Sequence, residues 1–258
     1  MANPYIQAIQ PDSIPQEVYQ QAAAYQLGEP RQVYKPRFTS PLAILGITLG
    51  VIILDIIVFV AILLVGYIWY LLIAVPIAAI IWCCISIPHT NTRAYVFNYG
   101  LIYGKGGRLE PLRWDQIQVV WHKIIKSRYS TSHQFTMQRN DGQSFKLPTI
   151  LKHIEDLGVT IEDEVARVLL PGALAAYNAG QMIILGRVTV DQRGIGNGKD
   201  IIPWAKVGSI TLKDRNLMVE KMGQQVKLSV RVDEVPNLGL LASLVTTIVS
   251  RGGQVARY

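Results

Sequence analysis

The chain has 258 residues, a formal net charge of +7 and a hydrophobic fraction of 50%. Its two cysteines, Cys83 and Cys84, are adjacent, which excludes the disulfide framework of a small secreted domain and fits a reducing compartment. The surplus of positive charge is not accompanied by a nucleic-acid-binding motif, so we expect no nucleic-acid partner.

Residues 1–40 are expected to form a flexible cytoplasmic tail that contains one short helix. Five prolines interrupt this stretch, which argues against a packed domain. Ser13 and Gln16 have the spacing of a capping box, and Gly28 can end the helix that they begin. The stretch from Gln16 to Leu27 is otherwise polar and rich in alanine, as expected of a surface helix.

Residues 41–88 are predicted to form a transmembrane helical hairpin, because they hold only one charged residue, Asp55. The hydrocarbon core of a bilayer is ~30 Å thick and a helix rises ~1.5 Å per residue, so about 20 apolar residues make one span. The run is long enough for two spans, which we place at residues 42–65 and 68–87. A buried helical hairpin in a soluble protein is the alternative.

Charged residues on the two flanks of the hairpin predict its orientation. Cytoplasmic flanks of membrane spans carry an excess of Lys and Arg, and here both flanks are basic: Arg31, Lys35, Arg37, His89 and Arg93. We therefore expect a multi-pass protein of the bacterial inner (plasma) membrane with both termini in the cytoplasm. The first apolar run begins near residue 42, so we expect no cleaved signal peptide.

Asp55 lies near the middle of the first predicted span. An ionised carboxylate at the centre of a bilayer costs ~2.5–3.5 kcal/mol, and neither predicted span contains a Lys, Arg, His, Asn or Gln that would pair with it. We favour a protonated Asp55 that hydrogen-bonds within the hairpin or across a homo-oligomer. The alternative is a proton or ion path, as in an oligomeric transporter or channel.

Residues 89–171 are predicted to form a first domain. Short β-rich runs extend from Arg93 to Leu147, and Asp141-Gly142 is a strong signal for a hairpin turn. Apolar residues then recur at helical spacing between residues 150 and 170, where Gly158 is expected to divide the segment into two short helices.

Residues 172–258 are predicted to form a second domain with the same order of elements, β-rich runs followed by a helix from about Val235 to Ser250. Two motifs match between the domains, which indicates an internal duplication. Leu112-x-Trp114-x-x-Ile117 corresponds to Ile202-x-Trp204-x-x-Val207, and Gly100-Leu101 corresponds to Gly194-Ile195.

The segment Tyr95-Val-Phe-Asn-Tyr-Gly-Leu-Ile-Tyr103, followed by Leu112-Arg-Trp-Asp-Gln-Ile117, resembles bacterial pleckstrin-homology-like (PH-like) domains. The chain is also similar to an uncharacterised bacterial membrane family that carries two N-terminal transmembrane helices and an "RWDQI" segment. The second copy, Ile202–Val207, departs from the motif because it lacks the Arg and the Asp. The resemblance implies domains made of a bent antiparallel β-barrel and a C-terminal helix, which bind lipid headgroups, peptides or proteins.

Positive charge is concentrated in the first predicted domain, where seven Lys and Arg residues stand against two acidic residues between Arg93 and Arg128. The positive-inside bias of a domain close to the bilayer accounts for such a surplus. The sharper hypothesis is a binding site for an anionic lipid or an anionic protein partner. We centre this site on Lys123, Lys126 and Arg128 beside Tyr129, and the candidate residues are Lys105, Arg108, Arg113, Lys123, Lys126 and Arg128.

No motif predicts catalysis. Gly194–Lys199 resembles a phosphate-binding loop, but Asp200 stands where a Ser or Thr is needed for magnesium, so we expect a β-turn. The four histidines lack the spacing of a metal site, although His122 and His133 can approach each other across a hairpin. We therefore predict that the protein is not an enzyme and uses neither a cofactor nor a metal.

These observations predict an α+β fold, with a two-helix transmembrane hairpin followed by two tandem PH-like domains. The predicted function is that of a membrane-anchored cytoplasmic binding or scaffold protein, whose domains recruit an anionic lipid or protein partner at the inner leaflet. The alternatives are an oligomeric transporter or channel component that uses Asp55, and a non-catalytic subunit of a membrane complex.

Overall fold

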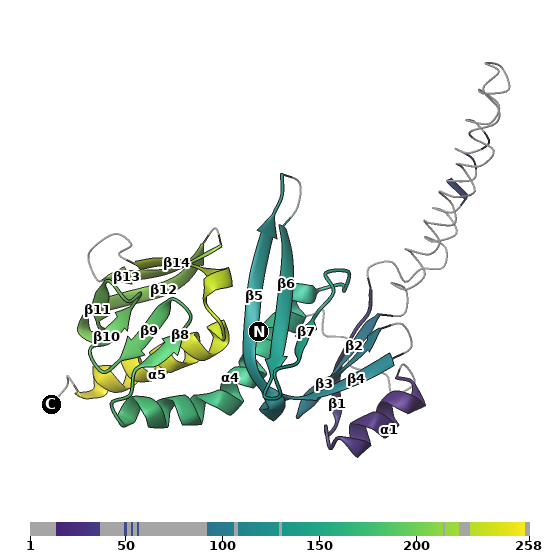
Figure 1. The fold of residues 1–258 in the computed structure, drawn as a ribbon, viewed down its shortest axis with the longest axis horizontal. Coiled ribbons are helices and arrows are strands. Elements are labelled where there is room, and N and C mark those ends of the chain that lie inside the picture. The colour runs from purple at the N-terminus through teal and green to yellow at the C-terminus, as the bar shows by residue number, and fades with distance from the viewer. Residues whose placement is uncertain are drawn as a thin grey trace, which may run out of the picture. The chain divides into compact units, whose positions relative to one another are not determined.

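The computed structural model describes residues 14–36, 49, 50, 53, 56, 92–105, 108–128, 131–213, 215–221 and 228–255. These residues fall into two compact units. Unit 1 comprises the described residues up to Pro111 together with residues 150–152, and unit 2 comprises residues 112–149 and those from His153 onward. The helices and strands of both units are labelled in Figure 1.

Unit 1 is a helix packed on a four-stranded sheet. The sheet has the order β1-β2-β3-β4, and β1 and β3 each run antiparallel to β2. Val18 and Ala22, four residues apart, are buried from the helix against Phe97 and Ile102 of the sheet. The elements are α1 (Gln16–Ala24), β1 (Pro30–Tyr34), β2 (Arg93–Phe97), β3 (Gly100–Lys105) and β4 (Arg108–Arg113).

The short helix predicted within residues 1–40 is confirmed as α1 (Gln16–Ala24), whereas the strand β1 (Pro30–Tyr34) was not predicted in this stretch. β1 is an edge strand whose partner lies some sixty residues later, with Val33 opposite Tyr95. Pro30 is tolerated because it is the first residue of an edge strand. The predicted capping box is wrong, since the helix begins after Pro15 without a side-chain cap.

The predicted transmembrane hairpin is not supported, so the predicted fold class and the inner-membrane localisation are corrected. Among the described residues, no helix combines the length and the apolar character needed to cross a membrane. The helix α1 has only nine residues, and α4 and α5 bury one face against strands. The residues on which the hairpin was predicted, 41–88 with Asp55, lie outside the described residues apart from Leu49, Gly50, Ile53 and Ile56.

The first part of unit 2 is a three-stranded antiparallel sheet with the order β5-β6-β7, which packs against the long helix α4. The predicted turn at Asp141-Gly142 is confirmed, because Gly142 has a φ of 85° and the Asp141 carboxylate accepts a hydrogen bond from the Gln143 N–H. The elements are the 3-10 turn η2 (Trp114–Gln116), β5 (Ile117–Lys126), β6 (Thr131–Arg139), β7 (Ser144–Lys146) and α4 (Ile154–Asn178).

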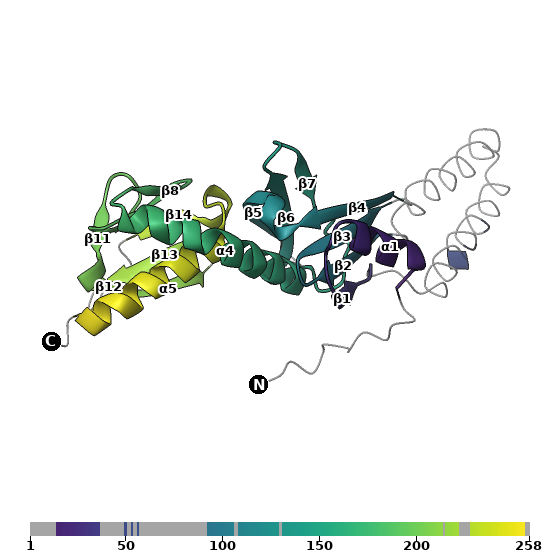
Figure 2. The ribbon, with the colours of Figure 1, turned by 90° about the horizontal axis from the view of Figure 1, so that it is seen from below.

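The second part of unit 2 has a four-stranded sheet, a three-stranded sheet and a helix around one apolar core. The strand orders are β11-β10-β9-β8 and β12-β13-β14, and α5 lies beside α4 (Figure 1 and Figure 2). The elements are β8 (Ile183–Leu185), β9 (Val188–Asp191), β10 (Gly194–Gly196), β11 (Ile201–Pro203), η3 (Trp204–Lys206), β12 (Val207–Lys213), β13 (Asn216–Lys221), β14 (Leu228–Arg231), η4 (Val232–Glu234) and α5 (Leu238–Val255).

The order of elements repeats along the chain. Four strands, a 3-10 turn that begins with tryptophan, three strands and a helix occur first from β1 to α4 and again from β8 to α5. The matched residues Trp114 and Trp204 begin the two turns η2 and η3. The first series starts at β1, ahead of the domain predicted for residues 89–171. Its helix continues past residue 171 to Asn178, and Tyr177 near its end packs edge-on against Trp204.

Candidate functional site

The six cations predicted to form one binding site are divided between the two compact units. Lys105 and Arg108 belong to β3 and β4, and both lie in unit 1. Arg113 is held by Asp115, with 2.9 Å between Nη2 and Oδ2. The hydrogen bonds from Arg113 lower the pKa of the Asp115 carboxyl, so this arginine is already paired with an anion.

Lys123, Lys126 and Arg128 stay exposed in unit 2, and β5 determines where Lys123 points. Side chains alternate between the two faces of a strand, and in β5 Val120 and His122 are buried whereas Trp121, Lys123 and Ile125 are exposed. The exposed residues of β5 therefore share one face of the sheet. Tyr129, placed beside these cations in the sequence analysis, lies outside the described residues.

The strand register shows which side chains share this face with Lys123. Residues directly opposite each other in an antiparallel pair lie on the same face. Trp121, Lys123 and Ile125 face Thr136, Gln134 and Ser132 of β6, and Thr136 in turn faces Lys146 of β7. We call these seven residues the outer face: Trp121, Lys123, Ile125, Ser132, Gln134, Thr136 and Lys146.

The outer face carries two lysines, a half-exposed tryptophan and no acidic residue. Trp121 is 36% exposed and Ile125 is 41% exposed, so both apolar side chains are available to a partner. Lys126 and Arg128 continue the positive charge at the end of β5. The arrangement suits the binding of an anion next to an apolar group, because it has cations, hydroxyl and amide groups and an indole.

Trp121 and Lys146 were missed as candidate residues in the sequence analysis. The alternation of buried and exposed positions along β5 is a signal that could have identified Trp121. Its neighbours Val120 and His122 are buried in the core, so Trp121 points to the exposed face. Lys146 carried no comparable signal, because its place beside Thr136 depends on the register of β6 with β7.

A pair of histidines, of which one is buried and one is partly buried, lies on the other face of the same strands. His122 of β5 and His133 of β6 approach with 2.9 Å between Nε2 and Nδ1, as the sequence analysis had considered. The His122 ring also stacks on Phe135, with 4.3 Å between the ring centroids. His122 is 8% exposed and is buried in unit 2, whereas the His133 side chain is 15% exposed and is partly buried.

Two carboxylates of α4 flank the histidine pair. Glu162 Oε1 lies 3.3 Å from His122 Nδ1, and Glu155 Oε1 contacts His133 Nε2. Within the described part of the chain, the buried atoms His122 Nδ1 and Glu162 Oε1 have no well-aligned hydrogen bond. The pKa of His133 is lowered, chiefly by burial; Glu155 opposes this shift, and His122 adds to it.

These side chains do not form a metal centre in the structure. Across the described residues, no group of three or more His, Cys, Asp or Glu side chains is placed to hold a metal ion. The segment Gly194–Lys199, expected to be a β-turn, begins as the strand β10 (Gly194–Gly196). A turn follows, in which Asn197 Oδ1 accepts hydrogen bonds from the N–H groups of Lys199 and Asp200.

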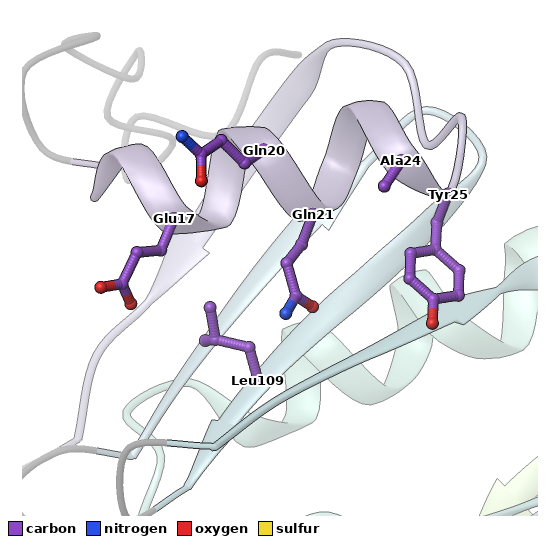
Figure 3. Close-up of a pocket in the computed structure, with 6 residues that line it drawn as sticks. All are labelled: Glu17, Gln20, Gln21, Ala24, Tyr25 and Leu109. Carbon is purple, nitrogen blue, oxygen red and sulfur yellow. The ribbon is translucent and has the colours of Figure 1, made fainter.

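A separate cavity of about 440 Å³ lies in unit 1 between α1 and Leu109 of β4 (Figure 3). Three side chains of this segment point toward the strand that carries Leu109: Glu17, Gln21 and Tyr25. The buried Gln21 Oε1 has no hydrogen-bond partner among the described residues. One carboxylate, amides and a phenol do not make a nucleophile with a base, so this cavity does not have the groups of a hydrolytic site.

Comparison with known proteins gives one family. The model of the family described as "Family of unknown function (DUF6585)" matches residues 1–254. No curated protein matches the chain. Because the match covers nearly the whole sequence, the chain belongs to the DUF6585 family.

Proposed function

We propose that this member of the DUF6585 family is a non-catalytic binding protein that recruits an acidic protein segment through the outer face. The observation that carries the proposal is the composition of that face, which has exposed cationic and apolar side chains and no carboxylate. A face with this charge pattern attracts anions and adds no repulsion of its own.

The spacing of the outer face supports a partner that contacts both lysines at once. Neighbouring strands are ~4.8 Å apart, and side chains two residues apart on one strand are ~7 Å apart. Lys146 lies two strands from Trp121, and Lys123 is two residues from Trp121 on β5. The backbone positions of Lys123 and Lys146 thus lie ~7 Å and ~10 Å from that of Trp121 in perpendicular directions and ~12 Å from each other, a distance that a few residues of an extended chain can span.

The polar residues between the lysines favour a protein segment over a lipid surface. Ser132, Gln134 and Thr136 form a line along β6 on this face. Their hydroxyl and amide groups offer directional hydrogen bonds, which a peptide backbone can match. Anionic headgroups, by contrast, are attracted mainly by charge, at roughly 1 kcal/mol for each Lys or Arg near the surface.

The repeated order of elements supports a further proposal, that the family is related to PH-like binding proteins. The motif residues that carry this resemblance begin a 3-10 turn in each series, at Trp114 and at Trp204. A relationship of this kind favours binding over catalysis, although fold by itself does not determine function.

The test is the binding of a fluorescein-labelled peptide with alternating Glu and Leu residues to the full chain, measured by fluorescence anisotropy. The double variant Lys123→Glu/Lys146→Glu should weaken binding at least about tenfold, equivalent to ~1.4 kcal/mol. The matched control is Lys199→Glu/Lys213→Glu, which changes the net charge equally at two exposed lysines outside the outer face. The control should change the affinity by less than about threefold.

Two outcomes would contradict the proposal. An equal loss of affinity in both double variants would mean that only the net charge matters. Binding to vesicles that contain about 30% phosphatidylserine, without binding to the acidic peptide, would instead assign the face to a lipid surface.

A further inference from the structure

Four titratable side chains form a continuous line behind the outer face, where the β5–β6 hairpin packs against α4. The line runs from Glu162 of α4 to His122 of β5, then to His133 of β6 and back to Glu155 of α4. The side chains of His122 and Glu162 are each only 10% exposed. Three different elements therefore meet at a row of groups that exchange protons.

The other groups around this line add little positive charge. On α4, Asp163 lies next to Glu162, and its pKa is raised chiefly by burial and further by the neighbouring carboxylates. Asp156 of the same helix pairs with the exposed His153 at 3.6 Å. From α5, the backbone of Gly239 lies close to the Glu162 carbonyl. Within the described part of unit 2, the ion-pair partner of Glu162 is thus a histidine and not a Lys or Arg.

The contacts determine how many protons the line can hold. His133 Nε2 contacts the Glu155 carboxylate, so Nε2 must carry a proton. In a neutral His133 the other nitrogen, Nδ1, is then an acceptor, and His122 Nε2 must donate a hydrogen bond to Nδ1. If His122 is also neutral, its Nδ1 carries no proton and faces the Glu162 oxygen at 3.3 Å, which sets two acceptors against each other.

One added proton resolves this conflict, and a second one creates a new conflict. A proton on His122 Nδ1 makes it a donor to Glu162, a charge-assisted contact between β5 and α4. A second proton would go to His133 Nδ1, where it would meet the N–H of His122 across 2.9 Å. The lowered pKa of His133 agrees with its role as the neutral member of the pair.

We propose that this row is a one-proton switch in which protonation of His122 clamps β5 to α4 and holds the outer face in its binding form. The inference rests on the proposed function of that face. Trp121 and Lys123 flank His122 on the same strand and point to the opposite side of the sheet. A displacement of the His122 backbone therefore moves the two outer-face residues with it.

The switch predicts tighter partner binding at lower pH. Binding linked to one proton changes by at most about tenfold per pH unit. We expect the full chain to bind the acidic peptide about tenfold more tightly at about pH 6 than at about pH 8. Lysines keep their charge over this range, so they do not produce the change.

Glu162→Gln is the decisive variant, because its amide can donate to a neutral His122 Nδ1 without an added proton. Its affinity should be high and independent of pH. His153→Asn is the matched control, since it removes an exposed histidine with a φ of 58° and asparagine tolerates that conformation. The control should keep the pH dependence of the unmodified chain, and pH dependence that persists in Glu162→Gln would overturn the switch.

A second measurement does not depend on partner binding. In ¹⁵N-histidine NMR of a His89→Asn/His153→Asn chain, which keeps only His122 and His133, the signals of these two histidines should shift together in one step that takes up one proton. Two independent titrations would overturn the switch even if the peptide bound as proposed. A single coupled step without any peptide binding would instead refute the proposed function and leave the switch supported.

Discussion

Gly158 is the residue at which the packing of α4 can be tested most directly. A Cβ atom added at Gly158 would overlap the ring of Phe135, which is fully buried between this helix and the β5–β6 hairpin. Gly172, on the same helix, is exposed, and a Cβ atom added there would meet nothing within 4 Å. The two glycines therefore share a secondary structure and differ in what surrounds them.

The expected energies follow from this difference. Replacing glycine by alanine inside a helix usually stabilises by ~1 kcal/mol, and this gain applies to both positions. The Cβ added at Gly158 would lie 1.9 Å from Phe135 Cζ, so the Phe135 ring must also move by roughly 1.6–2.1 Å to restore ordinary carbon contacts of ~3.5–4.0 Å. Overpacking of a core typically costs ~1–3 kcal/mol, and the helix gain cancels in the comparison, so Gly158→Ala should be less stable than Gly172→Ala by about 1–3 kcal/mol.

The assay is equilibrium unfolding of the full chain in urea, followed by circular dichroism, with the midpoints of both variants compared at an unchanged slope. A double-mutant cycle provides a further control, because Phe135→Leu shortens the overlapping side chain and should remove much of the penalty of Gly158→Ala. If both alanine variants raise the midpoint equally, the close contact between α4 and Phe135 is refuted.

Two further predictions concern hydrogen bonds that hold unit 2 together. Asn237→Ala should lower the free energy of unfolding by about 2–4 kcal/mol in the same assay. The Asn237 side chain accepts a hydrogen bond from the Val120 N–H at 2.7 Å and donates one to the Gln118 carbonyl, and the residue has a φ of 53°. Asn237→Gly should lose less stability, because glycine tolerates that φ. Trp204→Phe should lose ~1 kcal/mol more than Trp114→Phe, because Trp204 donates to the Asp191 carbonyl at 2.9 Å whereas the buried Trp114 Nε1 lacks a partner among the described residues. Equal losses in either comparison would count against these bonds.

The candidate site shows where reasoning from sequence reached its limit. A cluster of cations in the sequence predicted one binding site, but Arg113 is paired with Asp115, and Lys105 and Arg108 belong to the other compact unit. Sequence distance does not reveal such pairing, because the geometry of the strand end decides which acid a nearby arginine meets. The approach of His122 to His133 was foreseen as a hairpin contact, whereas their contacts with Glu155 and Glu162 were not.

The helix α4 and the strand β1 show the same limit for the fold. Gly158 was expected to break the helix, since glycine is a poor helix former, but it lies inside a continuous helix where its missing side chain makes room for Phe135. The strand β1 was expected to be part of a tail, because five residues between prolines carry only a weak signal for a strand. Its partner strand β2 is remote in the chain, so the pairing is not visible locally in the sequence.

What the sequence determined by itself was local or repeated. The Asp141-Gly142 turn, the turn near Asn197 and the match of Trp114 with Trp204 depend on residues a few positions apart, whose conformations follow from their own chemistry. The tertiary structure decided which strands pair, which lysines share a face with Trp121, and which carboxylates meet the histidines. Those features require register between distant segments, and a shift of one residue would turn every side chain of β5 to the opposite face.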